Sequence, residues 1–118
     1  MKNKINFMVF TLLFSLHANA AFSAKESKEL ALINSQHEAK LIDAEKSFSN
    51  SVKEAIDNDP DKKDTILTLK KSWDEFIKAK CDLEVFESKG TDAETAELSN
   101  CLVNEYTNAE KYFEHILP

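Results

Sequence analysis

Apolar and small side chains recur every three or four residues over three long stretches of this chain, and charged residues fill the positions between them. In the first stretch these positions are Leu30, Ile33, His37, Leu41, Ala44, Phe48, Val52 and Ala55. Because such steps keep side chains on one side of a helix, the pattern predicts a first helix over residues 25–56. Good helix formers dominate the composition, and one glycine and two prolines leave few points at which helices can end.

The stretch DNDPDKKD (57–64) separates this helix from a second one. Asp59 is a suitable N-cap and Pro60 a suitable first helical residue, so the second helix is expected over residues 60–87. Its apolar positions are Ile66, Leu69, Trp73, Phe76, Ile77, Cys81 and Val85. They predict a face that is buried against the other helices.

Gly90 marks the end of the second helix, because glycine adopts the left-handed conformation of a helix C-terminus without strain. The sequence TDAE (91–94) then fits a capping box, in which the Thr91 hydroxyl caps the next helix and the Glu94 carboxylate reaches back. A third helix is expected to run to about Ile116. Its inward or partly inward positions are Leu98, Cys101, Leu102, Tyr106, Ala109, Tyr112, Phe113 and Ile116.

The first twenty residues have the pattern of a secretory signal peptide. Two lysines precede the apolar run INFMVFTLLFSL, and ANA follows with the small residues that suit cleavage after Ala20. The run is shorter than the roughly 20 apolar residues that span a bilayer. We therefore expect a cleaved segment over residues 1–20, a single domain over residues 21–118, and a periplasmic or secreted location.

The chain has two cysteines, Cys81 and Cys101, and an oxidising compartment would join them in a disulfide. A helical hairpin that turns at residues 90–91 places residues equally distant from the turn side by side. The cysteines lie nine residues before this turn and ten after it, a mismatch of about 1.5 Å that a disulfide can absorb. The sequence thus predicts an all-α, antiparallel up-down bundle of about three long helices, with one disulfide joining the last hairpin. By the same count Trp73 lies opposite residues 109–112, where a tyrosine can contact its edge.

The net charge of the chain limits the classes of partner that the protein is expected to bind. The 21 acidic residues outnumber 15 lysines, there is no arginine, and the net charge is −6. Removal of the two N-terminal lysines would leave 13 against the same 21 acids, a net charge of −8. Nucleic-acid binding requires a positive surface, and membrane-surface helices require a basic polar face, so neither nucleic acid nor membrane insertion is expected. A basic protein partner remains compatible with this charge.

Candidate chemistry is sparse. The two histidines that remain after cleavage lie on the first and last predicted helices and lack zinc-protease spacing, so no metal is expected. Ser72 and Ser99 lack a nearby histidine, and the single glycine supplies no phosphate-binding or oxyanion loop. Pairs such as Asp74 and Lys78 are interpreted as ion pairs that support a helix. We therefore expect no catalytic role and no cofactor.

One spaced set of residues is typical of a known exported module. It comprises a Trp, an aromatic three positions later, a Cys eight after the Trp, a loop glycine, and a second Cys followed by Leu. Here these residues are Trp73, Phe76, Cys81, Gly90, Cys101 and Leu102. Residues 67–114 with this pattern resemble the LprI-like lysozyme inhibitor family, and the stretch 41–56 is similar to its first helix. The chain departs from the family at Ile77, where members usually carry a basic residue.

The resemblance implies an exported binding protein, and inhibition of a lysozyme-type cell-wall hydrolase is the function that it favours. Two alternatives stay open: a periplasmic immunity protein against a secreted effector toxin, and an envelope accessory protein with another partner. The candidate binding surface consists of acidic loop residues that could complement a basic muramidase. These residues are Asp57, Asp59, Asp61, Glu87, Asp92 and Glu94.

Overall fold

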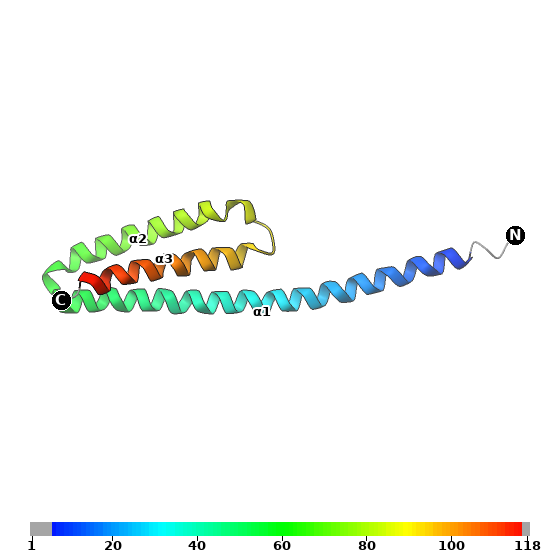
Figure 1. Cartoon of the computed structure of the whole chain (residues 1–118), viewed down its shortest axis with the longest axis horizontal. Coiled ribbons are helices and arrows are strands. Elements are labelled where there is room, and N and C mark those ends of the chain that lie inside the picture. Colours follow the sequence, from blue (N-terminus) through cyan, green and yellow to red (C-terminus); the bar gives the residue numbers. More distant parts are fainter. Residues whose placement is uncertain (1–5, 117–118) are drawn as a thin grey trace. The chain divides into compact units, whose positions relative to one another are not determined.

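The computed structural model describes residues 6–116, with side chains from residue 23 onward. Over this range the backbone is helical apart from short connections (Figure 1). The elements are α1 (Asn6–Asn58), η1 (Pro60–Lys62), α2 (Lys63–Glu84), η2 (Phe86–Ser88) and α3 (Glu94–Ile116), of which η1 and η2 are single 3₁₀ turns. The all-α prediction with three long helices is confirmed. The expected signal peptide over residues 1–20 lies outside the residues whose side chains are described and stays a prediction.

The chain divides into two compact units, Met1–Ile33 and Asn34–Pro118, and α1 belongs partly to each. The second unit contains the antiparallel bundle. In it α2 runs back along the C-terminal part of α1, and α3 returns beside both (Figure 1). The helix predicted over residues 25–56 is thus the middle and end of a longer element.

The junction between α1 and α2 differs from the predicted one. Pro60 begins a 3₁₀ turn, and α2 itself begins only at Lys63. Asp59 occupies the N-cap position of this 3₁₀ turn, but its carboxylate makes no capping hydrogen bond and instead pairs with Lys62 at 2.6 Å. The Lys62 amide bonds the Asp59 carbonyl at 3.1 Å, which explains the tight turn. At the other end α2 stops at Glu84 rather than at residue 87.

The turn between α2 and α3 agrees closely with its sequence. Gly90 has φ +77°, a left-handed backbone conformation that residues other than glycine rarely adopt. The Thr91 hydroxyl accepts a hydrogen bond from the Ala93 amide at 3.3 Å. The Glu94 carboxylate accepts one from the Gly90 amide at 2.8 Å, one residue further back than a capping box requires. The Thr91 hydroxyl also donates a hydrogen bond to the Ser88 carbonyl at 2.6 Å, so hydrogen bonds stabilise both sides of the turn.

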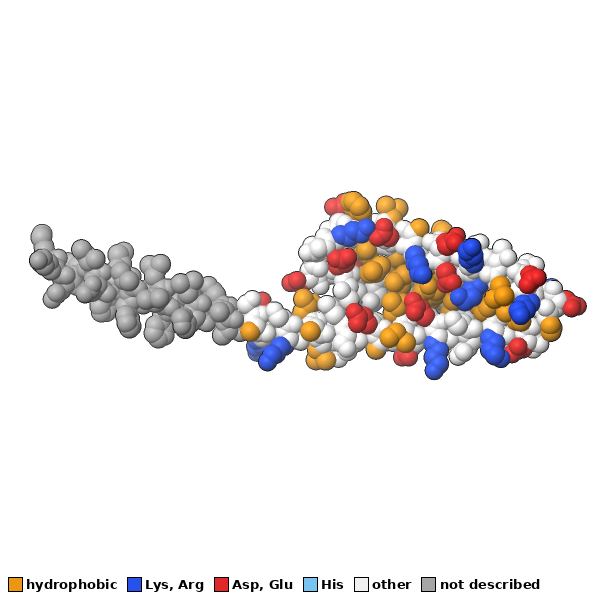
Figure 2. Space-filling view, turned by 180° about the vertical axis from the view of Figure 1, so that it is seen from behind, with side chains coloured by type: hydrophobic (Ala, Val, Ile, Leu, Met, Phe, Trp, Pro, Cys, Tyr) orange, Lys and Arg blue, Asp and Glu red, His pale blue; other side chains and the backbone are white. Residues whose placement is uncertain are grey.

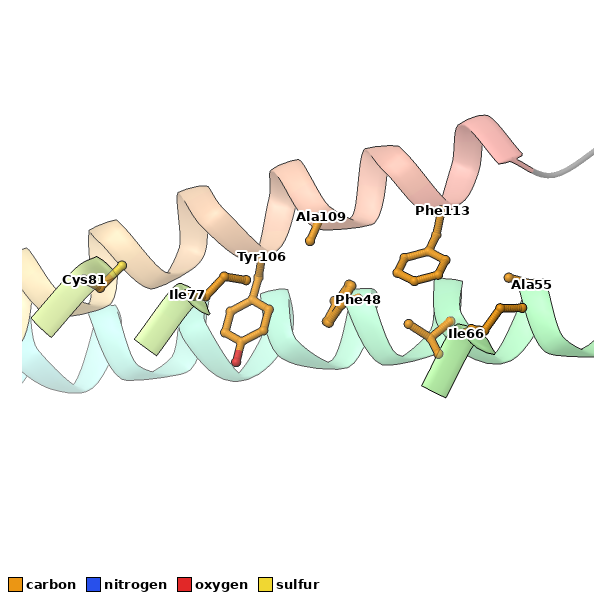
Figure 3. Packing of buried hydrophobic residues seen from close by; sticks show 9 residues of the cluster. Phe48, Ala55, Ile66, Ile77, Cys81, Tyr106, Ala109 and Phe113 are labelled. Carbon is orange, nitrogen blue, oxygen red and sulfur yellow. The ribbon is translucent and has the colours of Figure 1, made fainter. Parts of the chain in front are cut away.

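One hydrophobic core joins the three helices of the bundle (Figure 3). Its buried side chains are Phe48, Val52, Ala55, Ile66, Ile77, Cys81, Tyr106, Ala109 and Phe113. Phe76 was expected in this core and is 57% exposed, so that prediction is wrong. Adjacent helical residues point about 100° apart, and it is Ile77, 1% exposed, that faces inward. Three other expected positions, Ile33, Tyr112 and Ile116, are also about half exposed.

Aromatic rings form the centre of this core. The ring of Phe48 on α1 lies 5.5 Å from Tyr106, 5.8 Å from Phe113 and 6.4 Å from Trp73, measured between centroids. Trp73 meets Tyr112 edge-on at 5.0 Å, which confirms the expected contact between the indole and a tyrosine. Such edge-on and tilted pairs add about 0.5–1.5 kcal/mol each beyond the burial of area.

The disulfide lies where the hairpin count placed it. Cys81 on α2 and Cys101 on α3 are bonded, with their Cα atoms 5.7 Å apart. Cys81 is fully buried, whereas Cys101 is half-buried. In the chain-entropy model, closing a loop of this length stabilises the fold by about 3 kcal/mol.

Candidate functional site

The acidic loops that the sequence marked as a binding surface lie at opposite ends of α2. Asp57, Asp59 and Asp61 precede this helix, whereas Glu87 and the later acids follow it. A helix of 22 residues is about 33 Å long. The structure therefore separates the candidate residues into two clusters, and a small partner cannot contact both through one compact interface.

At the α1–α2 end, nearby lysines pair with the carboxylates. Asp57 and Lys53 lie 2.6 Å apart, as do Asp59 and Lys62. The hydrogen bond from each lysine, and then the charge of its partner, raises the pKa of Lys53 and of Lys62. Asp61 is exposed and forms no ion pair among the described residues. Local pairing thus reduces the negative field that this end presents to a partner.

At the opposite end, which we call the α2–α3 tip (residues 86–94), fewer of the carboxylates are paired with lysines. Glu87 and Asp92 are exposed, and neither forms an ion pair within the described part of the chain. Glu94 is half-buried and holds the turn through the Gly90 amide. Ser88 donates a hydrogen bond to Glu97 on α3, a second link across the tip. The tip therefore presents two carboxylates on a backbone that hydrogen bonds and the nearby disulfide hold in place.

A polar pocket of about 210 Å³ opens between α1 and α2. Its lining includes Tyr106 and Asp74, whose hydroxyl and carboxylate are hydrogen-bonded at 3.2 Å. Lys70 donates to the other Asp74 oxygen at 2.9 Å and lies 5.7 Å above the Phe48 ring. The predicted partner of Asp74 was Lys78, and that assignment is wrong: the carboxylate turns back toward α3 and Lys70.

The electrostatics of this pocket favour a structural role for Tyr106. Burial, together with the negative charges of Asp74 and Glu45, raises the pKa of Tyr106 to about 12. The phenol therefore stays protonated near neutral pH and acts as a hydrogen-bond donor between α3 and α2. A group with this pKa is a poor general base at neutral pH.

Two further polar contacts connect neighbouring helices. Lys80 on α2 bonds Glu105 on α3 at 2.5 Å and Glu84 at 2.7 Å, and these hydrogen bonds raise the pKa of Lys80. Ser47 on α1 donates to Glu110 on α3 at 2.6 Å. The sequence did not indicate either contact, because each depends on how the helices are rotated against one another. The face in Figure 2 shows the result, with lysine and acidic side chains interspersed among apolar ones.

The described residues contain neither a metal-ligand cluster nor a membrane-spanning helix. In that part of the chain, no three His, Cys, Asp or Glu side chains are grouped so that they could hold a metal ion. Of the helices there, none has both the length and the hydrophobicity needed to cross a bilayer.

Comparisons with models of known families, with curated proteins and with solved structures find no match to this chain. The resemblance to the LprI-like family therefore stays a hypothesis that depends on the spacing of Trp73, the two cysteines and Gly90.

Proposed function

We propose that this protein is an exported binding protein that inhibits a lysozyme-type cell-wall hydrolase. The observation that carries the proposal is the α2–α3 tip, where Glu87 and Asp92 are exposed without lysine partners among the described residues. Lysozyme-type muramidases that are basic would meet a surface of opposite charge there. Complementary charge speeds encounter and fixes orientation.

The rigidity of the tip supports the same proposal. Binding is weakened when a loop must be ordered on contact, and a loop already fixed in place avoids much of that cost. Here the Cys81–Cys101 bond lies within the same hairpin, and the Gly90 amide is bonded to Glu94. Elsewhere in the bundle the ion pair of Lys80 on α2 with Glu105 on α3 links two helices, which suits a scaffold that presents a surface.

A lysis assay with purified protein tests this proposal. Inhibition of peptidoglycan hydrolysis is measured against basic c-type, g-type and i-type lysozymes at increasing molar ratio. We expect the double variant Glu87→Lys, Asp92→Lys to inhibit about tenfold more weakly at low salt, and this difference to shrink as salt is added. The matched control is Asp57→Lys, Asp61→Lys, which makes the same charge change at the opposite end and should inhibit like the wild type.

Two results would count against the proposal. Absence of inhibition by the wild type at a large molar excess over every lysozyme would overturn it and would favour the immunity-protein alternative. Equal losses from both double variants would show that total charge matters and that the tip has no special part.

A further inference from the structure

Large apolar side chains lie exposed along the second half of α2 and its continuation into η2. Phe76 is 57% exposed, Leu83 75% and Phe86 60%. Ala79, between them, is also exposed. Phe76, Ala79 and Leu83 recur at steps of three and four, so they share one side of α2 over about 10 Å, and Phe86 follows three residues later in η2. We call this set the apolar stripe.

The stripe is distinct from the face of α2 that builds the core. The buried residues of this helix are Ile66, Ile77 and Cys81, and none of them belongs to the stripe. With about 200 Å² for each fully exposed large side chain, the three large members present about 400 Å² of apolar surface. Patches of this size on a monomer are often functional. A helix whose outer face were only a solvated surface would carry polar residues at these positions.

Acidic groups border the stripe. By helical position Glu75 and Asp82 flank it on one side of α2 and Glu84 on the other, and Glu87 follows Phe86 in η2. Glu75 and Glu87 form no ion pair among the described residues. With Lys80 and Lys89 counted against its four acids, the border keeps a net charge of −2, and it continues at Phe86 into the α2–α3 tip.

The two lysines beside the stripe offset part of this charge. Lys80 is held between Glu84 and Glu105, at 2.7 and 2.5 Å. Lys89 pairs with Asp82 at 2.7 Å and lies 5.2 Å above the Phe86 ring. Both ammonium groups are engaged with carboxylates of this chain, so neither is poised to meet an acid on another molecule.

This charge distribution decides between two kinds of occupant. A second copy of the chain would bring one acidic border against another, which like-charge repulsion disfavours. A basic protein with an apolar patch would place lysines or arginines against the border and bury the stripe beneath. Interfaces commonly have this arrangement, with apolar anchors at the centre and a polar rim.

We propose that Phe76, Leu83 and Phe86 are the apolar centre of the surface that binds the basic muramidase, with the α2–α3 tip at one end of that surface. This inference rests on the proposed function and adds the face of the protein that performs it. Large side chains at the centre of an interface usually contribute most of its affinity.

Serine substitutions in the stripe test the inference. The variants are Phe76→Ser, Leu83→Ser and Phe86→Ser, with binding to a basic c-type lysozyme measured by calorimetry and inhibition by the lysis assay. We expect at least one of them to weaken binding about 30-fold or more. Matched controls are Leu67→Ser on another face of α2 and Ile42→Ser on α1, positions that are 41% and 63% exposed and should change affinity by less than about threefold.

A fold check accompanies each variant. Because the stripe is exposed, circular dichroism and urea unfolding should match the wild type. Leu83→Gln, at the most exposed position, is a milder second variant and should still weaken binding by about fivefold or more.

The outcomes separate the two proposals. If the wild type inhibits and the stripe variants inhibit equally well, the stripe is not the binding surface, although the proposed function stands. If the wild type neither binds nor inhibits any lysozyme tested, both proposals are overturned. If sedimentation shows a wild-type dimer that the stripe variants abolish, the occupant is a second copy and the inference is wrong.

Discussion

Phe48→Ala would remove the side chain on which all three helices of the bundle converge. Phe48 is 1% exposed, and its ring contacts aromatic rings from both α2 and α3. The substitution leaves a cavity that rigid helices can close only partly. It should therefore destabilise the fold without altering any surface group.

The expected size of the effect follows from these contacts. Truncation of a buried Phe to Ala typically costs about 3–5 kcal/mol. Three aromatic partners place Phe48 in the upper half of that range, at about 4–5 kcal/mol. A domain of this size has about 5–15 kcal/mol of total stability, so the variant should lose about a third of it or more.

Urea unfolding followed by the fluorescence of Trp73, the single tryptophan, measures this change. With a slope of about 2 kcal/mol per molar urea, the midpoint should fall by about 2 M. Phe76→Ala is the matched control, because the same truncation at a side chain that is 57% exposed should cost less than about 0.5 kcal/mol. Equal shifts in the two variants, or a shift below about 1.5 kcal/mol for Phe48→Ala, would refute the placement of these two rings.

Three further predictions concern the hairpin and the polar pocket. Reduction of the Cys81–Cys101 bond should lower the free energy of unfolding by about 3 kcal/mol, and identical urea curves with and without reductant would contradict this. Because its pKa is raised to about 12, Tyr106 stabilises the fold fully below pH 10, and that contribution should disappear as the pH rises from about 10 to 12. In a difference titration at 295 nm between wild type and Tyr106→Phe, a midpoint near 10 would disprove the shift. Gly90→Ala meets no neighbouring atom yet must hold φ +77°, so it should lower stability by about 1 kcal/mol in urea, and an unchanged midpoint would argue against the strain.

Much of the hairpin could be predicted because it follows from local rules. A period of 3.6 residues identifies the helices, and only glycine takes the left-handed conformation readily, so Gly90 marks the turn. Equal distances from that turn then bring Cys81 and Cys101 together, and the measured Cα separation of 5.7 Å agrees. Each of these arguments needs only the chain within a few helical turns of the residue concerned.

Local rules of this kind predicted less of the candidate site. The two acidic loops were predicted before and after the second helix, and they lie at the opposite ends of α2. Only the structure shows that Lys53 and Lys62 neutralise one end while Glu87 stays without a lysine partner among the described residues. Which lysine rotamer meets which carboxylate depends on the surrounding packing.

The sequence by itself thus determined the helices, their turn and their covalent link, since periodicity, glycine conformation and chain distance are properties of the chain alone. The rotation of α2 about its own axis was decided only by tertiary structure. This helix has apolar residues on two sides, and its periodicity cannot choose between Phe76 and Ile77. Contact with both α1 and α3 turns Ile77 into the core, directs Asp74 to Lys70 and Tyr106, and leaves Phe76 on the surface.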